Sequence, residues 1–289
     1  MQKPQVSIII VHYSRQQILF DCIASILKNT KSNIEIIIVD NGNKEIKSKL
    51  LRISRKIIYI KSLYNIGYAA GNNFGAKKAI GKVLLILNPD TLIVDDSVTI
   101  LANYINNNHD VGLVGPKLLD RKLNPYQQIG IRELSPLRAV FVLSILSKIL
   151  PNNRFLKEYW KNCDQKEPIS VDIVGGSVMA INRELYNKIG GFDENFFLYF
   201  EEVDLCKRLK DKGYKIMVFP QAKFIHFWKA TTPKKPYIKR IFLKSRFYYF
   251  KKHYGFFKAV TVEFFTRISA KHIFAGAIFL SICILAQLF

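Results

Sequence analysis

The chain has 289 residues and a formal net charge of +22, from 44 Lys and Arg against 22 Asp and Glu. Apolar residues make up 49% and aromatic residues 13%, which excludes an intrinsically disordered chain and a multi-span membrane protein. This length fits one large domain, or one domain with an appendage. The charge excess indicates an anionic partner: nucleic acid, a membrane surface or a phosphorylated substrate.

Most of the positive charge lies in the last third of the chain. Residues 205–289 contain 18 Lys and Arg but only two acids, Asp211 and Glu263. The four cysteines lack CxxC spacing, so we expect neither a disulfide framework nor a zinc site, and a reducing cytoplasm is the expected compartment. The N-terminus leads directly into an apolar run without the pattern of a secretory signal, so we expect no export.

The first part of the chain, 6–119, alternates short β-rich runs with amphipathic stretches. This is typical of βαβ units around a mostly parallel, buried sheet. Strands are predicted at 6–11, 34–39, 56–60, 83–87 and 111–114. Helices are predicted around 18–27, after Gly67 and over 95–104, where apolar residues recur at helical spacing.

The second part is less regular. Residues 121–168 carry four prolines and are interpreted as an excursion from the sheet, in which 137–150 forms a helix that packs on the core or touches a membrane. Regular structure is predicted to resume at 171–177, with helices from 183 and over 201–212 and a strand at 215–219.

The C-terminal tail differs from the rest. Residues 237–258 mix Lys and Arg with Phe and Tyr, and residues 273–289 contain no charge. As a helix, that uncharged run is about 26 Å long at ~1.5 Å per residue, slightly short of the ~30 Å hydrocarbon core of a bilayer. It is predicted to be a marginal span or a membrane-embedded anchor, and the alternative is a buried C-terminal helix in a soluble dimer.

Polar residues follow three of the predicted strands. His12 and Tyr13 end the first strand, Asp40 the second, and Asn88 and Asp90 the fourth. Ligands collect at the carboxyl ends of parallel strands, although either acid alone is more simply explained as a helix cap or turn former. The absence of a Walker A sequence, and of GxGxxG after the first strand, argues against P-loop and dinucleotide-binding proteins.

A second acidic group lies late in this basic chain. On a helix, Glu201 and Asp204 share a face, whereas Glu202 points about 100° away. Some of this charge is explained by the preference of helix N-termini for acids. His226 alternates with apolar residues, and a lone His of this kind is more often structural than a ligand.

The ordered set of motifs resembles the family-2 glycosyltransferases of GT-A fold, and within them the bacterial rhamnosyltransferase-like branch. The segments that carry the resemblance are VSIIIVHY (6–13), VDNG (39–42), NIGYAAGNNFG (65–75), LNPDT (87–91), GGSVM (175–179) and GFDENFF (191–197), which runs into YFEEVDLC (199–206). The resemblance implies an α/β, GT-A (Rossmann-like) domain over 1–230, with a mostly parallel central sheet and an irregular or helical insertion at 121–170. Residues 231–289 would form a basic, amphipathic and hydrophobic membrane-associating region.

The resemblance implies transfer of a sugar, with inversion, from a nucleotide-sugar donor. The residues expected to bind the nucleotide-sugar are His12, Tyr13, Asp40, Asn65, Gly67, Asn73, Asn88 and Asp90. Asn88-Pro-Asp90 takes the place of the family's DxD-type motif, so Asp90 would hold Mg²⁺ or Mn²⁺ on the diphosphate, with His226 as a late metal ligand. Such a cation neutralises the charge that develops on a leaving diphosphate.

The acceptor hydroxyl needs a base on the side opposite the diphosphate. Where the family usually has Asp after Glu, this chain has Glu202, which is the expected base, with Asp204 as the second candidate and Glu201 supporting. Residues expected on the acceptor side are Gly176, Phe192, Asp193 and Trp228.

The favoured donor is dTDP-rhamnose, with UDP-hexoses open, and the expected acceptor is a lipid-linked or growing saccharide of bacterial cell-surface polysaccharide. The basic, aromatic tail predicts docking on the anionic cytoplasmic face of the cell membrane, and a homo-oligomer is left open. Two alternatives remain: a catalytically inactive family member that serves as a scaffold, and a nucleic-acid-binding protein. For the second, the chain lacks an RRM, KH or zinc-finger pattern, so no nucleic-acid partner is expected.

Overall fold

The computed structural model describes residues 3–42, 44, 46–125, 130–161, 166–227 and 236–267. The chain divides into two compact units. The first comprises 1–132 and 160–245, and the second comprises 133–159 and 246–289. The division thus groups part of the predicted insertion with the C-terminal helices. The predicted membrane segment at 273–289 lies outside the described residues.

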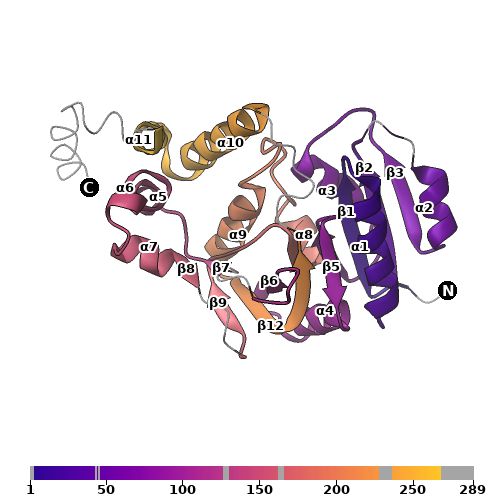
Figure 1. Cartoon of the computed structure of the whole chain (residues 1–289). Coiled ribbons are helices and arrows are strands. Elements are labelled where there is room, and N and C mark those ends of the chain that lie inside the picture. The colour runs from indigo at the N-terminus through magenta and orange to yellow at the C-terminus, as the bar shows by residue number, and fades with distance from the viewer. Residues whose placement is uncertain are drawn as a thin grey trace. The chain divides into compact units, whose positions relative to one another are not determined.

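The first half of the central sheet in unit 1 is parallel (Figure 1). Strand β1 lies between β2 and β4, and β3 pairs with β2 at the edge. Their bounds are β1 Val6–His12, β2 Ile34–Asp40, β3 Ile57–Lys61 and β4 Val83–Leu87. These four strands agree with the prediction, because β-branched runs that are buried on both faces favour parallel strands.

The second half of the sheet is mixed. The nine-stranded sheet continues β4-β11-β6-β12-β5, and β9 also pairs with β12. The bounds are β5 Thr91–Val94, β6 Val111–Leu119, β9 Ile169–Val171, β11 Val178–Asn182 and β12 Lys215–His226. Four pairings are parallel and four antiparallel, so the predicted mostly parallel sheet is corrected to a mixed one. Strand β11 returns from the excursion and enters between β4 and β6, which gives two of the antiparallel pairings. Strand β12 gives the other two, with β5 and β9.

Two strands are longer than the sequence pattern predicts. Strand β6 runs on through Pro116, and β12 runs on through Pro220 to His226. The β6–β12 register shifts between Phe219 and Lys223, which accommodates Pro220 because a proline cannot donate to a regular ladder. The extended part of β12, residues 223–226, pairs with β5.

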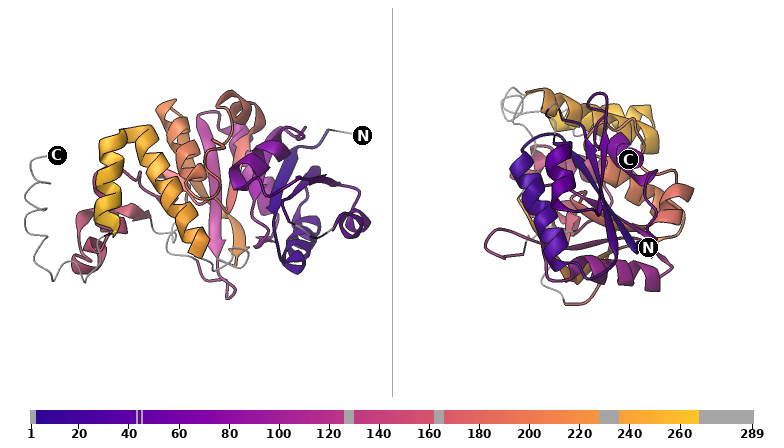
Figure 2. Two further views of the ribbon diagram at one scale, coloured as in Figure 1. Left: turned by 90° about the horizontal axis from the view of Figure 1, so that it is seen from above. Right: turned by 90° about the vertical axis from the view of Figure 1, so that its right-hand side faces the viewer.

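Helices cover both faces of the sheet (Figure 2). Helices α1 (Gln16–Asn29) and α4 (Ser97–Asn107) pack their apolar stripes on one face, against a cluster that includes Ile8, Ile10 and Ile36. Helix α3 (Tyr68–Ala76) covers the other face, where a Cβ added at Gly75 would lie 2.6 Å from Ile9 Cγ2. The glycine therefore permits close packing of α3 on β1.

The remaining elements of unit 1 lie around this core. They are α2 Lys47–Ile53, α8 Arg183–Lys188, α9 Glu201–Asp211, the start of α10 Pro236–Tyr254, and a small sheet of β10 Ile173–Val174, β7 Gly130–Ile131 and β8 Trp160–Lys161. Helices α8 and α9 begin where the sequence predicts.

Unit 2 is helical in its described part. It contains α5 Pro136–Leu143, α6 Leu146–Ile149, α7 Arg154–Tyr159, the end of α10 and α11 Phe256–Arg267. The helix predicted at 137–150 is thus divided between α5 and α6. Arg246 and Glu263 form a buried ion pair at 2.7 Å, and Tyr254 donates to Glu133 at 2.7 Å. Among the described residues, none of the helices combines the length and apolarity that a membrane crossing requires.

Candidate active site

The pairing of β5 with β12 brings Asp90 and His226 together. His226 lies opposite Thr91 in the ladder, and the Phe227 amide donates to the Asp90 carbonyl at 2.8 Å. The His226 Nε2 atom is 3.5 Å from Asp90 Oδ1, and both side chains are largely buried. A carboxylate and an imidazole at this separation are suited to share a divalent cation.

The segment around Gly176 lies beside the Asn88–Asp90 turn. Strand β11 pairs antiparallel with β4, so the Asn88 amide donates to the Ser177 carbonyl at 2.8 Å. The Tyr68 hydroxyl, from the start of α3, donates to the Gly176 carbonyl at 2.8 Å. Three chain segments that are distant in the sequence therefore meet at this strand end.

Helix α9 supplies the carboxylate at this place. A Cβ added at Gly176 would lie 3.5 Å from Glu202 Cβ and Cγ, so the Glu202 side chain covers the glycine. The Oε2 atoms of Glu201 and Glu202 are both buried, and neither has a hydrogen-bond partner within the described part of the chain. A buried carboxylate oxygen without a partner is costly, which is typical of a functional position rather than a structural one.

Burial shifts the acidity of these groups. Desolvation raises the pKa of Glu202 above 4.5, and desolvation together with the neighbouring Glu202 charge raises the pKa of Glu201 well above it. Burial first, and then the charges of Glu201, Glu202 and Asp90, raise the pKa of the Tyr68 phenol well above 10. Tyr68 is therefore a neutral hydrogen-bond donor.

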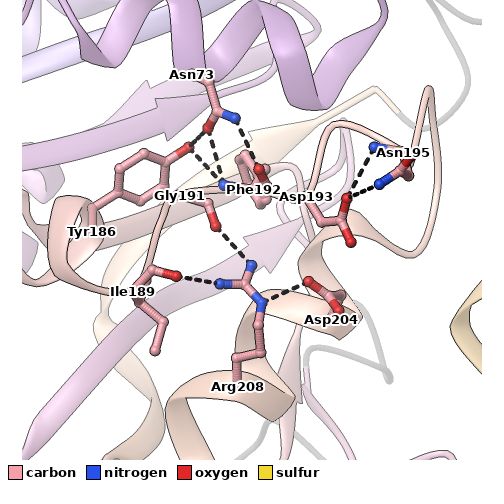
Figure 3. Close-up of polar contacts among 9 residues, drawn as sticks. All are labelled: Asn73, Tyr186, Ile189, Gly191, Phe192, Asp193, Asn195, Asp204 and Arg208. Carbon is pink, nitrogen blue, oxygen red and sulfur yellow. Dashed lines mark hydrogen bonds and ion pairs between the residues drawn. The ribbon is translucent and has the colours of Figure 1, made fainter. Parts of the chain in front are cut away.

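Asp204 differs from its neighbours because its carboxylate is engaged. Arg208 Nε donates to Asp204 Oδ2 at 2.7 Å, and Asp204 is fully buried (Figure 3). The same guanidinium donates to the carbonyls of Ile189 and Gly191. One oxygen of Asp204 is thus engaged by Arg208, whereas Glu202 has a buried oxygen without a partner among the described residues.

Asp40 is also engaged. Its Oδ2 accepts from Tyr59 at 2.7 Å and from Lys61 at 3.0 Å, and its Oδ1 accepts from the Gly42 amide at 2.9 Å. Lys61 also donates to the Gly42 carbonyl. Asp40 is fully buried among these partners, which hold its carboxylate in one position.

The two residues that end β1 differ in exposure. His12 is buried and Tyr13 is 42% exposed. Burial lowers the pKa of His12, against the raising effect of the Asp40 charge, and its Nδ1 has no hydrogen-bond partner among the residues described. His12 is thus a neutral imidazole next to Asp40 in the β1–β2 register.

The other predicted donor-side residues shape the backbone. Asn65 Oδ1 accepts from the Gly67 amide at 3.1 Å, and Gly67 has φ 87°, a left-handed conformation that favours glycine. Asn73 is buried and makes four hydrogen bonds, to Tyr186, Glu194 and both backbone groups of Phe192. An amide has two donors and two acceptor sites, so Asn73 has no capacity left for a donor sugar.

The predicted acceptor-side residues are only partly brought together. Gly176 lies against Glu202, as described above. Phe192 is buried, with its ring centroid 6.3 Å from that of Tyr68. Asp193 accepts from the Asn195 amide and side chain at 3.0 and 2.8 Å, which shapes its own turn. Trp228 lies outside the described residues.

A divalent cation at this site would need ligands from the substrate as well as from the protein. Within the described ranges, no cluster of three or more His, Cys, Asp or Glu side chains could hold a metal ion. Asp90 and His226 would supply two ligands, and phosphate oxygens and water complete the shell of a hard cation bound to a nucleotide. The pair is therefore consistent with a cation that arrives with its diphosphate.

Sequence reasoning did not single out Tyr68, Lys61 and Arg208. Tyr68 lies within the motif 65–75, but its hydroxyl donates to the Gly176 carbonyl, which is 108 positions away in the sequence. The spacing of Arg208 four residues after Asp204 is the signal that predicts their ion pair. No sequence signal predicts that Lys61 covers Asp40.

Comparison with known proteins identifies the families that the chain resembles. The pattern of glycosyl transferase family 2 matches residues 7–190, and that of the N-terminal domain of galactosyltransferase matches residues 162–230. The chain is 28% identical over 218 residues to the low-salt glycan biosynthesis hexosyltransferase Agl10 of Haloferax volcanii. This match covers 73% of the chain and 63% of the length of that relative.

A second relative and a solved structure give further similarity. The N-acetylglucosaminyl-diphospho-decaprenol L-rhamnosyltransferase of Mycobacterium tuberculosis is 23% identical over 243 residues, covering 79% of this chain and 78% of that protein. The crystal structure of GalNAc-T7 with UDP, GalNAc and Mn²⁺ superimposes with a TM-score of 0.58 at 19% identity. It covers 78% of this chain and 44% of that one, and shows the same fold. The family pattern extends over more than half of the sequence, and the chain belongs to glycosyltransferase family 2.

Proposed function

We propose that this chain transfers a sugar, with inversion, from a nucleotide-diphosphate sugar to a hydroxyl group of a lipid-linked or growing saccharide. The favoured donor is dTDP-rhamnose, and UDP-hexoses are the alternative. The proposal draws on the named activities of the two relatives, a hexosyltransferase and a rhamnosyltransferase that acts on N-acetylglucosaminyl-diphospho-decaprenol.

One observation carries the proposal. The Glu202 side chain covers Gly176, and its buried Oε2 atom has no hydrogen-bond partner among the described residues. Glu202 lies on a different element from Asp90. Both carboxylates lie close enough to Tyr68 to raise its pKa. An inverting transfer requires a base and a diphosphate-binding group that approach one sugar from separate chain segments.

The chemistry follows from these positions. Glu202 takes the proton of the acceptor hydroxyl while the acceptor oxygen bonds to the anomeric carbon. The bond from that carbon to the diphosphate breaks, and the diphosphate keeps the electron pair. Asp90 and His226 would hold a divalent cation, which neutralises charge on the leaving diphosphate when bound; the similar GalNAc-T7 structure contains Mn²⁺.

We further propose that the protein works at the cytoplasmic face of the cell membrane. On α11, Phe256, Phe257, Val260 and Phe264 are all exposed, Phe257 to 85%. Lys258 and Arg267 are exposed on the same helix. Aromatic side chains beside basic ones favour the interface of an anionic bilayer.

The test is transfer by the full chain from a panel of nucleotide sugars, with N-acetylglucosaminyl diphosphate on a short lipid as acceptor. We expect one donor to be consumed and its sugar to appear on the lipid, only with Mg²⁺ or Mn²⁺ present. Donor binding without transfer to any lipid-linked saccharide would instead favour the inactive scaffold.

A further inference from the structure

The loop 190–197, here called the acceptor loop, lies within the connection from α8 to α9. It begins with two left-handed glycines, Gly190 at φ 83° and Gly191 at φ 64°, and it leads to Glu202 at the start of α9. Ordinary side chains at both glycines would strain the backbone on this path. A loop of this kind needs contacts from elsewhere to hold one conformation.

Asn73 holds the acceptor loop from the α3 side (Figure 3). Its Nδ2 donates to the Phe192 carbonyl at 2.8 Å and to Glu194 Oε1 at 2.9 Å. Its Oδ1 accepts from the Phe192 amide at 3.0 Å and from the Tyr186 hydroxyl at 2.6 Å. A Cβ at Gly191 would lie 2.6 Å from this oxygen, so the glycine also admits the contact.

Arg208 holds the same loop from the α9 side. Its NH1 and NH2 groups donate to the carbonyls of Ile189 and Gly191 at 2.8 and 2.7 Å. Asp204 fixes the guanidinium by accepting from Nε at 2.7 Å. Charge-assisted hydrogen bonds of this geometry are stronger than neutral ones. They therefore attach the first residues of the acceptor loop to α9.

We propose that Asn73 and Arg208 are positioning residues that fix the acceptor loop between the two helices that line the site. Tyr68 begins one of these helices and Glu202 lies in the first turn of the other. Fixing the loop sets where Glu202 stands relative to the acceptor hydroxyl. This role rests on the proposed transferase function, and it assigns Asn73 to acceptor-side geometry rather than to donor binding.

The test compares Asn73→Ala and Arg208→Lys with the unaltered protein. Lysine keeps the charge beside Asp204, but it cannot reproduce the planar fork that reaches two carbonyls. We expect kcat/KM for the lipid-linked acceptor to fall about 100-fold in both variants, as for a misplacement of about 1 Å. We expect the Kd for the nucleotide sugar, and the slow donor hydrolysis by water, to stay unchanged.

Two control variants separate positioning from folding. Asn108→Ala removes a comparable amide, which donates to the Tyr104 carbonyl at the end of α4. Lys207→Gln removes the charge of the residue next to Arg208. The Lys207 Nζ atom lies 3.3 Å from Asp211 Oδ1. Both controls should leave acceptor kinetics unchanged.

Three results would overturn the inference. Weaker nucleotide-sugar binding by Asn73→Ala would place Asn73 on the donor side. Unchanged acceptor kinetics in both variants would show that the loop needs neither residue. A role in folding alone would appear as a lower melting temperature together with equal losses of acceptor transfer and donor binding. An unaltered protein that binds no nucleotide sugar would refute the proposed function as well.

Discussion

Asp90 Oδ1 and His226 Nε2 lie 3.5 Å apart at the end of the β5–β12 ladder, although the two residues belong to opposite halves of unit 1. Their contact is set by the backbone, because the residues next to them pair directly. The two side chains therefore meet before any ligand arrives, and binding a cation costs little reorganisation.

Replacing Asp90 tests the diphosphate end of the site. We expect a nucleotide diphosphate with Mn²⁺ or Mg²⁺ to raise the thermal midpoint of the unaltered protein, since a ligand at 100 times its Kd adds about 2.7 kcal/mol. Asp90→Asn should lose this shift. Asp110→Asn, an exposed acid paired with Lys215, is the control and should keep it. Equal protection of both variants would exclude Asp90 as the cation ligand.

Replacing Glu202 tests the base. Glu202→Gln keeps the shape of the side chain but removes the basic oxygen, so kcat should fall by about 10²–10⁴-fold. Nucleotide-sugar binding, measured by calorimetry, should be unchanged. Glu184→Gln, on the exposed first turn of α8, serves as control. Normal turnover in Glu202→Gln would move the role of base to Asp204.

The buried acids also predict a pH dependence of stability. Because the pKa values of Glu201 and Glu202 are raised above 4.5 in the folded protein, the folded state holds more protons than the unfolded state just above that pH. Raising the pH through this window should lower the free energy of unfolding.

Urea unfolding at about pH 5 and about pH 8 measures this effect. The double variant Glu201→Gln, Glu202→Gln should show a smaller fall in free energy than the unaltered protein. An identical fall in both would mean that other groups cause it.

Two of the cysteines should be unreactive in the folded protein. Burial raises the pKa values of Cys22 and Cys206 to about 12, so neither thiol forms the reactive thiolate near neutral pH. Peptide mapping after treatment with iodoacetamide should find both unmodified until denaturant is added. Labelling of either one in the native protein would show that its surroundings open.

The exposed residues of α11 predict membrane binding. The double variant Phe257→Ser, Phe264→Ser should lower partitioning onto anionic phosphatidylserine vesicles by at least about tenfold, since burying one such ring contributes about 1.5–3 kcal/mol. Leu63→Ser is the control, because Leu63 is 99% exposed in unit 1. Equal partitioning of all three proteins in a sedimentation assay would exclude this face.

The sequence was sufficient to predict the parallel half of the sheet and its polar strand ends. Apolar β-branched runs identify β1, β2 and β4 without knowledge of their neighbours, and Asp90 lies three residues after the end of β4. The antiparallel entry of β11 could not be predicted, because strand order depends on tertiary pairing rather than on local pattern.

The candidate site was predictable only where local sequence pattern determines it. Helical spacing separates Glu202 from Asp204, and the structure shows Asp204 held by Arg208. The full set of hydrogen bonds at Asn73, and the three at Asp40, could not be predicted. Their partners lie on other elements, and Asn73 reaches residues more than 110 positions away.

The central position of β11 and the late position of β12 have a consequence for how the protein folds during synthesis. The first four parallel strands can collapse early, but β6 is joined to them only through β11, and β5 only through β12. Contacts of such long sequence separation form slowly. A nascent chain without β12 would thus lack the strand that joins β5 to the sheet and would lack His226, so the pairing beside Asp90 forms only after most of unit 1 has been synthesised.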